Sequence, residues 1–139
     1  MSFHEVRALG GCPVGLLDGV WMAQSPDGTC RQLEASQSLV TLLEHEPATF
    51  WDTLASDLDT RNLDAPAAAS FPLMASVRMG LNWPSEYWQG HALRWVAALG
   101  LSNDVIPELE RLVTEGRTQH LRHRARKLAR CYQVKDGTA

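Results

Sequence analysis

The chain has 139 residues, of which 45% are hydrophobic and 21% are charged, and its formal net charge is −3. This balance excludes a disordered chain, and the length predicts a single globular domain over residues 1–139. No apolar run is long enough to cross a bilayer, so we expect no membrane-spanning segment.

Charge is distributed unevenly along the chain. Residues 1–70 carry three basic and ten acidic side chains, a net of −7. Residues 71–139 carry ten basic and six acidic side chains, a net of +4. An asymmetry of this kind between two halves of a chain favours a binding function.

Three cysteines, Cys12, Cys30 and Cys131, stand far apart in the sequence. Their odd number and wide spacing argue against a disulfide framework or a zinc site and favour a cytoplasmic location. The stretch Leu9–Cys12 is faintly similar to a lipoprotein cleavage site. Because Glu5 interrupts the apolar segment that a signal peptide requires, we expect no lipid anchor.

Residues 1–35 differ in pattern from the rest and are expected to form an irregular N-terminal cap. Pro26-Asp27-Gly28 predicts a turn. Two arrangements are compatible with it: segments 19–23 and 29–33 pair as a short hairpin, or Leu16–Gln24 forms a helix. The alternation of apolar and polar residues is poor here, which counts against the hairpin.

A self-similar pattern follows the cap. At an offset of 37 residues three pairs coincide: Pro47 with Pro84, Trp51 with Trp88, and Ala55 with Ala92. A further offset of 33 residues brings Ala125 to the alanine position. The pattern predicts three helix–turn–helix units over residues 36–60, 71–99 and 103–132, with a loop at 64–70 and a frayed tail at 133–139.

The stretch 83–99 holds three of the five tryptophans. Pro84 is typical of a first helical turn and Gly100 of a helix end, so the stretch predicts one helix. Trp88 and Trp95 fall on a stripe of apolar residues at helical spacing. Both are therefore expected to be core residues.

The internal alignment extends these assignments to the other units. Trp51 occupies the position of Trp88 and is expected to be core. Ala55, Ala92 and Ala125 are expected where neighbouring helices cross, because a small residue lets helices approach closely. Aligned positions expected on the surface change from acidic through mixed to basic, which predicts an electrically polarised stack.

The segments "VIPELERLVTEG", "HLRHRARKLA" and "ALRWVAAL" resemble the HEAT-like class of α-helical repeats. The resemblance covers roughly residues 36–132, and the aromatic pairs Phe50–Trp51 and Tyr87–Trp88 depart from the usual pattern. It implies an all-α fold, a short right-handed solenoid of about three helix–turn–helix repeats that binds a macromolecule.

Catalytic patterns are missing from the sequence, which has no phosphate-binding glycine loop, no GxSxG and no HExxH. His120 and His123 stand one helical turn apart, as two metal ligands can, but the arginines and lysine around them would repel a cation. Cys12 has no partner base near it in the sequence. We therefore expect no enzyme, no metal ion and no cofactor.

Two binding functions fit the charge pattern. The first is a non-catalytic protein-binding module whose acidic surface engages a basic protein. A small helical protein of this kind looks like the bacterial immunity proteins, which block a toxin that is often a basic nuclease. The residues expected to contact such a partner are Glu44, Glu46, Asp52, Asp57, Asp59 and Asp64.

The alternative is a nucleic-acid-binding helical repeat protein that uses its basic C-terminal helix, with aromatic side chains available for stacking. Its contact residues would be Arg117, Arg122, Arg124, Arg126, Lys127 and Arg130. The sequence pI of about 5.9 counts against this alternative, because nucleic-acid-binding domains are usually basic. Neither the identity of the partner nor the oligomeric state follows from the sequence.

Overall fold

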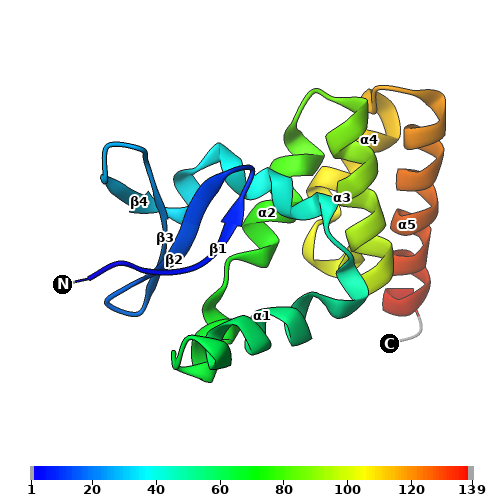
Figure 1. The fold of residues 1–139 in the computed structure, drawn as a ribbon. Helices are drawn as coiled ribbons and strands as arrows, with labels where there is room; N and C mark the ends of the chain where they lie inside the picture. The colour runs from blue at the N-terminus through cyan, green and yellow to red at the C-terminus, as the bar shows by residue number, and fades with distance from the viewer. Residues whose placement is uncertain (1, 138–139) are drawn as a thin grey trace. The chain divides into compact units, whose positions relative to one another are not determined.

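The computed structural model describes the backbone of residues 2–137 and the side chains of residues 2–130 other than residue 65. The chain divides into two compact units, Met1–Ser76 and Val77–Ala139, here called the N-terminal unit and the C-terminal unit (Figure 1). The division falls inside helix α2 (Leu73–Asn82). That both units belong to one domain stays a prediction.

The N-terminal unit begins with a meander. Among the described residues, four strands form one antiparallel sheet in chain order: β1 (His4–Leu9), β2 (Cys12–Leu17), β3 (Val20–Gln24) and β4 (Cys30–Gln32). Leu9 pairs with Cys12, and Leu17 with Val20, so two-residue turns join the first three strands. Gly10-Gly11 and Asp18-Gly19 form these turns, and all four residues have the positive φ that type I′ hairpins require.

The sheet overturns the all-α fold, the HEAT-like resemblance and the right-handed solenoid that the sequence predicted. Residues 4–32 form an ordered sheet where an irregular cap was expected, and the helix expected over Leu16–Gln24 does not form. The tight turns at 10–11 and 18–19 reverse the chain every few residues, which leaves no room for a helix. The hairpin alternative is confirmed: β3 pairs with β4 around Pro26-Asp27-Gly28.

One face of the sheet belongs to the core of the N-terminal unit. Its buried residues are Val6, Leu9, Val14, Leu16, Trp21 and Ala23. Gly15 is required in β2, because a Cβ atom there would lie 1.9 Å from the backbone carbonyl oxygen of His4 in β1. The Trp21 ring packs edge-on against Phe71, with centroids 4.9 Å apart, and its Nε1 donates a hydrogen bond to the Ala67 carbonyl. These contacts tie residues 67–71 to the sheet.

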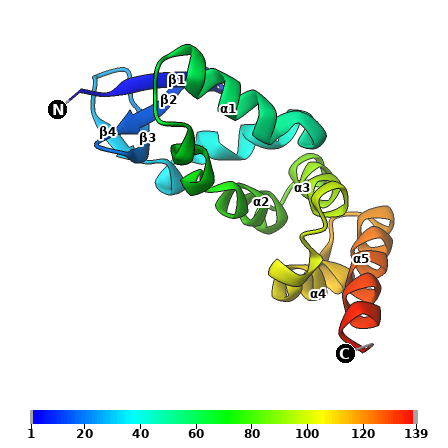
Figure 2. The ribbon, with the colours of Figure 1, turned by 90° about the horizontal axis from the view of Figure 1, so that it is seen from below.

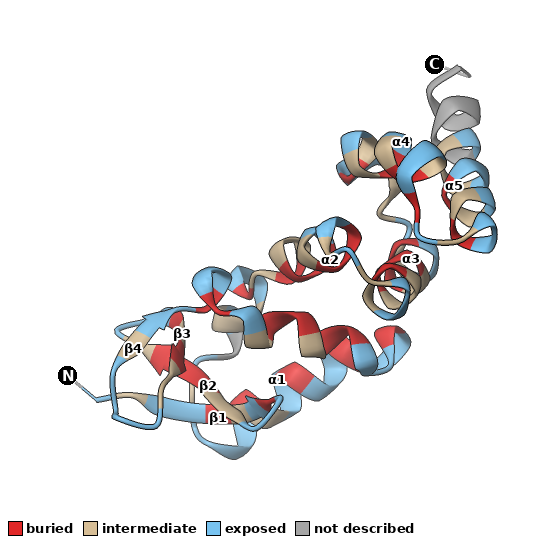
Figure 3. Ribbon diagram, turned by 90° about the horizontal axis from the view of Figure 1, so that it is seen from above, coloured by how far each residue is buried: buried red, intermediate tan, exposed pale blue. Residues whose placement is uncertain are grey.

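Short helices follow the sheet in the same unit. They are the 3-10 helices η1 (Leu33–Ala35), η2 (Gln37–Glu44) and η3 (Pro47–Thr49), then α1 (Phe50–Thr60) and the 3-10 helix η4 (Ala65–Ser70). The expected helix–turn–helix unit at 36–60 is therefore wrong in its first half, where the chain is 3-10 helix. The expected loop at 64–70 is largely η4. Helix α1 buries only the stripe Phe50, Leu54 and Leu58, as Figure 3 shows.

The C-terminal unit is helical in its described part. It contains the end of α2, then α3 (Glu86–Leu99), the 3-10 helix η5 (Ser102–Asp104), α4 (Ile106–Glu115) and α5 (Gln119–Gly137). Helix α3 starts after Pro84 and ends at Gly100, as the sequence predicted, with the Ser85 hydroxyl accepting a hydrogen bond from the Trp88 N–H. Helices α4 and α5 lie side by side (Figures 1 and 2). The expected tail is wrong for residues 133–137, which continue α5; residues 138–139 lie outside the described ones.

The structure buries some of the predicted core residues and leaves others partly exposed. Trp95, Ala92 and Ala125 in the C-terminal unit are fully buried, so their assignment to the core is confirmed. Trp51 in the N-terminal unit is 41% exposed, and Ala55 is exposed too. The expectation that Trp51 and Ala55 are core residues is therefore wrong. The side of α1 that carries them is not covered by other helices in the way that the Ala92 side of α3 is.

Gln89 is buried, although the internal alignment expected it on the surface. Leu93, a second aligned position expected on the surface, is buried too, so two of the three aligned surface series lose their middle member. The Gln89 Nε2 donates to the Trp83 carbonyl over 2.9 Å, and its Oε1 accepts from the Arg117 backbone N–H over 3.1 Å. One buried amide thus joins the turn before α3 to the turn before α5.

Candidate functional site

Helix α5 has a clear inner and outer face along its described side chains. Leu121 and Ala125 are buried against the rest of the C-terminal unit. The opposite face carries Gln119, His123, Arg126 and Arg130, which recur at three- and four-residue spacing and are all exposed. The outer face of α5 is therefore polar and rich in potential cations and hydrogen-bond donors.

The six basic residues predicted for a nucleic-acid contact divide into two groups. Arg122 and Arg124 turn back onto the protein: Arg122 Nη1 donates to the Gly116 carbonyl over 2.8 Å, and Arg124 Nη2 to the Gly90 carbonyl over 3.4 Å. Burial lowers the pKa of the Arg124 guanidinium, which marks it as partly desolvated beside α3. The other four residues, Arg117, Arg126, Lys127 and Arg130, are exposed.

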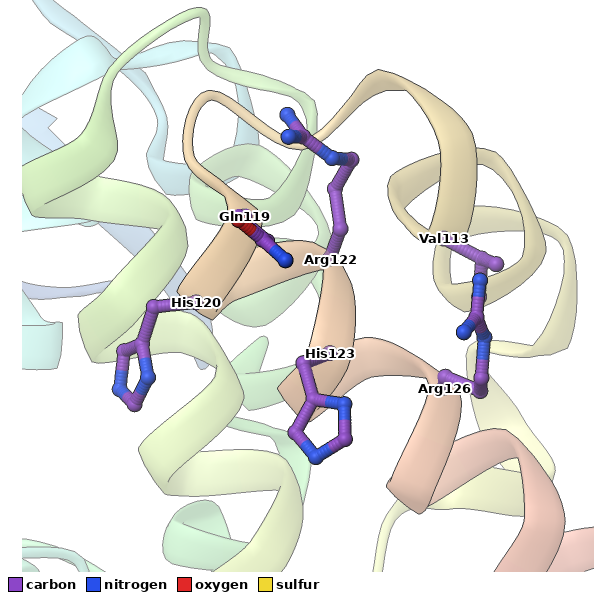
Figure 4. A pocket seen from close by; sticks show the side chains of 6 residues that line it. All are labelled: Val113, Gln119, His120, Arg122, His123 and Arg126. Atoms are coloured by element: carbon purple, nitrogen blue, oxygen red, sulfur yellow. The ribbon is translucent and has the colours of Figure 1, made fainter.

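An open depression of about 550 Å³ follows the outer face of α5 (Figure 4). Its lining residues are Val113 of α4 and Gln119, His120, Arg122, His123 and Arg126 of α5. Figure 4 shows the Arg126 side chain reaching towards Val113, while the two imidazole rings project from neighbouring turns of α5. Guanidinium and imidazole N–H groups in this arrangement can donate to the oxygens of an anion.

The described side chains of α5 do not neutralise the charge of this face. Residues 119–130 of α5 contain no carboxylate. The ion pairs given for the described part of the chain join Arg7 to Asp57 and Arg78 to Glu108, so neither uses a residue of α5. The carboxylates nearest to this stretch in sequence are Glu115 of the neighbouring helix α4, which is exposed, and Asp136 of α5, whose side chain lies outside the described ones.

The six carboxylates predicted to bind a basic protein are used differently from one another. Asp57 Oδ2 accepts hydrogen bonds from Arg7 Nη2 over 2.7 Å and from Arg7 Nε over 3.1 Å. Glu46 accepts a hydrogen bond from the Ala48 N–H over 3.2 Å at the start of η3. These two carboxylates therefore stabilise the N-terminal unit itself.

The remaining predicted carboxylates are exposed, but they are not one cluster. Asp52 and Asp59 are two helical turns apart on the outer face of α1, beside the half-exposed Trp51. Glu44 ends η2, and Asp64 precedes η4. The acidic group that α1 presents thus consists of two of the six predicted residues.

Four rings gather around the start of α3. The Tyr87 ring meets Trp88 edge-on, with centroids 4.9 Å apart, and meets His91 in the same way at 4.5 Å. Trp83 lies 6.5 Å from Trp88. Trp88 is only partly buried and Tyr87 is 51% exposed, so the core assignment of Trp88 is wrong.

The spacing of residues on α3 could have predicted this aromatic cluster, but the sequence analysis considered only the apolar stripe of the helix. Tyr87, His91 and Arg94 recur at four- and three-residue spacing on α3, on the side away from the buried Ala92 and Val96. Tyr87 was therefore missed as an exposed aromatic residue because its neighbour was counted as core.

The histidines and cysteines that the sequence analysis considered as metal ligands or nucleophiles form no such site among the described residues. Within the described residues, no group of three or more His, Cys, Asp or Glu side chains is placed to hold a metal ion. His120 and His123 instead line the depression on α5. The Cys12 thiol, at the start of β2, donates to the Gln24 carbonyl over 3.4 Å, while the side chain of Cys131 lies outside the described ones.

None of the described helices has both the length and the apolar character needed to span a bilayer. Comparison of the chain with known protein families, with characterised proteins and with solved structures gives no match. The two surfaces described above, basic on α5 and acidic on α1, are therefore the basis for a functional proposal.

Proposed function

We propose that the chain is a non-catalytic binding protein whose C-terminal unit contacts the phosphates of a nucleic acid through the outer face of α5. The observation that supports this proposal is the exposed row His123, Arg126 and Arg130, flanked by Lys127, on a helix face without a carboxylate. Arginine matches phosphate oxygens with two parallel N–H groups, so such a row suits a phosphate backbone.

The proposal ranks nucleic acid above the basic protein that the sequence favoured. Two of the six predicted carboxylates are engaged within the N-terminal unit, by Arg7 and by the Ala48 N–H. Two of the six predicted basic residues are engaged in the same way, but three of the exposed ones follow one another on the single helix α5, whereas the exposed carboxylates are spread over η2, α1 and residue 64. Nucleic-acid binding by local contacts depends on the field near the surface, which is screened over about 10 Å, rather than on the net charge of the chain.

Salt dependence tests the proposal. If Arg117, Arg126, Lys127 and Arg130 each neutralise a phosphate, affinity for a duplex should fall about 100-fold between about 50 and about 200 mM salt. Fluorescence anisotropy with a labelled oligonucleotide measures this. The double variant Arg126→Glu/Arg130→Glu should weaken binding and lower the salt slope by about 2.

A matched control changes net charge equally elsewhere. Arg31→Glu/Arg61→Glu alters two exposed arginines of the N-terminal unit. It should leave affinity nearly unchanged if contacts are local to α5. An equal loss of affinity in both double variants would mean that binding depends on the net charge and not on α5, which contradicts the proposal. If the wild-type chain does not bind at low salt, the proposal is refuted.

A second candidate function belongs to the N-terminal unit, where Trp51 is 41% exposed beside Asp52 and Asp59. An exposed aromatic ring next to carboxylates suits a basic protein segment, because the ring and the charges attract cations. Biolayer interferometry with an immobilised lysine-rich peptide tests it. Asp52→Lys/Asp59→Lys should abolish binding, whereas Asp18→Lys/Asp27→Lys, which changes two exposed carboxylates of the hairpin turns, should not.

We place the protein in the cytoplasm as part of the same proposal. Cys12 and Cys30 are both free thiols, although they lie on strands of one sheet. Free thiols are typical of a reducing compartment. Fractionation of the native host, followed by immunoblotting, tests the location.

A further inference from the structure

Tyr87 presents a fixed aromatic surface to solvent. It leaves 51% of its surface exposed, although it contacts Trp88 at an interplanar angle of 81° and His91 at 71°. Both contacts have the edge-to-face geometry that aromatic pairs prefer, so they hold the ring in place. A planar ligand that stacks on it would find the ring already ordered.

Helix α5 crosses α3 one helical turn after Tyr87. A Cβ atom on Gly90 would lie 3.7 Å from Leu121 Cδ2 and 3.8 Å from Arg124 Nη1, so the missing side chain allows the close approach of α5. The Gly90 carbonyl also accepts the hydrogen bond from Arg124. The exposed ring of α3 therefore lies beside the basic helix.

The flank of α5 that carries Arg124 has basic residues over the stretch 120–127. His120, Arg124 and Lys127 recur at four- and three-residue spacing, so they form one row next to the outer face. On α3, Tyr87 shares its row with His91 and Arg94. The row of α3 that contains Tyr87 and the basic row of α5 thus belong to two helices that meet at Gly90.

We propose that this surface of α3 and α5 binds single-stranded nucleic acid, with a base stacked on Tyr87 and the phosphates held by Lys127 and the outer face of α5. The inference rests on the proposed function and adds the ligand class. Proteins that bind single strands combine a positive track for the backbone with aromatic rings on which bases stack. In a duplex the bases are already stacked and paired, so their faces are closed to Tyr87 unless the duplex is opened.

The test compares three fluorescein-labelled ligands of equal length on the full chain: oligothymidine, an abasic strand and a blunt-ended duplex of two separate strands. Tyr87→Ala should weaken oligothymidine binding about tenfold, since each stacked base contributes on the order of that factor or more. Binding of the abasic strand and the duplex should be unchanged, because neither offers a free base. Tyr87→Phe, which keeps the ring, should restore oligothymidine binding.

Trp51→Ala is the matched control. Trp51 is also a half-exposed aromatic residue at the second position of a helix, and its removal should leave all three affinities unchanged. If Tyr87→Ala binds oligothymidine like the wild type while Arg126→Glu/Arg130→Glu does not, the stacking site is refuted and the phosphate-binding function stands. Equal loss on all three ligands would assign Tyr87 a structural role and refute the inference. Failure of the wild type to bind any ligand would refute the proposed function itself.

Discussion

The two units differ in how they use their charged residues. The N-terminal unit carries three basic and ten acidic side chains and the C-terminal unit ten basic and six acidic ones, so the charge boundary of the sequence coincides with the structural division. In the N-terminal unit the best-defined charge contact, Arg7–Asp57, joins β1 to α1 and so stabilises the fold. In the C-terminal unit, four cations stand on the surface around and along α5. Charged side chains thus serve local structure in both units, but only the C-terminal unit gathers several exposed cations along one helix.

The largest difference in stability between the two units is expected for variants of their tryptophans. Trp95→Ala in the C-terminal unit should cost about 3–5 kcal/mol, because the ring is fully buried. Trp51→Ala in the N-terminal unit should cost about 1 kcal/mol or less, because 41% of that side chain is exposed. Urea melts followed by circular dichroism measure both. Similar losses in the two variants would contradict the difference in packing; if Trp95→Ala does not fold, Trp95→Phe provides a milder measurement.

The aligned alanines give the next contrast. Ala92→Leu should overpack a fully buried site and cost about 1–3 kcal/mol. Ala55→Leu adds the same atoms on the exposed face of α1, where leucine is nearly as good a helix former, so stability should change little. Thermal melts of the pair suffice. A neutral Ala92→Leu would show that the helices around α3 pack more loosely than described.

The ion pair of the N-terminal unit should give a smaller effect. Asp57→Asn keeps the shape of the side chain but removes the charge that receives two hydrogen bonds from Arg7, and we expect a loss of about 1 kcal/mol. Asp52→Asn is the matched control on the same helix, exposed and expected to be neutral. Chemical denaturation at low and high salt measures both variants. If both variants lose the same free energy of unfolding, the ion pair between Arg7 and Asp57 does not stabilise the fold more than an exposed carboxylate does.

The smallest effect is a pH dependence in the N-terminal unit. Burial of the imidazole, and after it the Arg7 guanidinium, lower the pKa of His45 below its ordinary value of 6.5, while Glu44 opposes the shift. The folded state therefore disfavours the charged imidazole, so the contribution of His45 is fully present above pH 6.5 and is lost as the pH falls through the lowered pKa. His45→Gln should flatten the stability profile over that window. An unchanged profile in melts across the pH series would contradict the shift.

Much of the C-terminal unit followed from the sequence because its signals are local. Pro84 and Gly100 mark the two ends of α3 within a few residues of chain, and the observed helix follows them. The same logic correctly begins a helix after Pro47, but it misjudges the surroundings of α1. Which face of a helix is buried depends on the elements that pack against it. The alignment assumed that α1 packs like α3, but α1 is in contact with other elements.

The sheet was missed although its turns are visible in the sequence. Gly10-Gly11 and Asp18-Gly19 are two-residue type I′ signals flanked by short apolar segments. Gly10-Gly11 lies in the stretch that resembles a lipoprotein cleavage site, and Asp18-Gly19 lies in the stretch 16–24 that was considered as a helix. Neither pair was therefore interpreted as a turn. Segments 19–23 and 29–33 alternate poorly, which counted against the hairpin. In β1 the register shifts between Glu5 and Arg7, so Val6 and Leu9 are both buried despite their odd spacing.

The candidate site could be predicted in composition but not in orientation. The basic residues of α5 were identified, yet nothing in their spacing distinguishes Arg124, which bonds to Gly90, from Arg126, which faces solvent. That distinction depends on where α3 crosses α5, and therefore on the absence of a side chain at Gly90. Tertiary packing decides which cations a partner can reach.

The buried amide of Gln89 has a consequence for slow motions of the C-terminal unit. Its two hydrogen bonds serve the Trp83 carbonyl and the Arg117 N–H, so the turn before α5 cannot open without releasing the turn before α3. The Arg117 amide proton, although it lies in a turn, should therefore exchange with deuterium at the rate of the surrounding helices. The two turns would then appear in hydrogen exchange as one cooperative unit that opens and closes together.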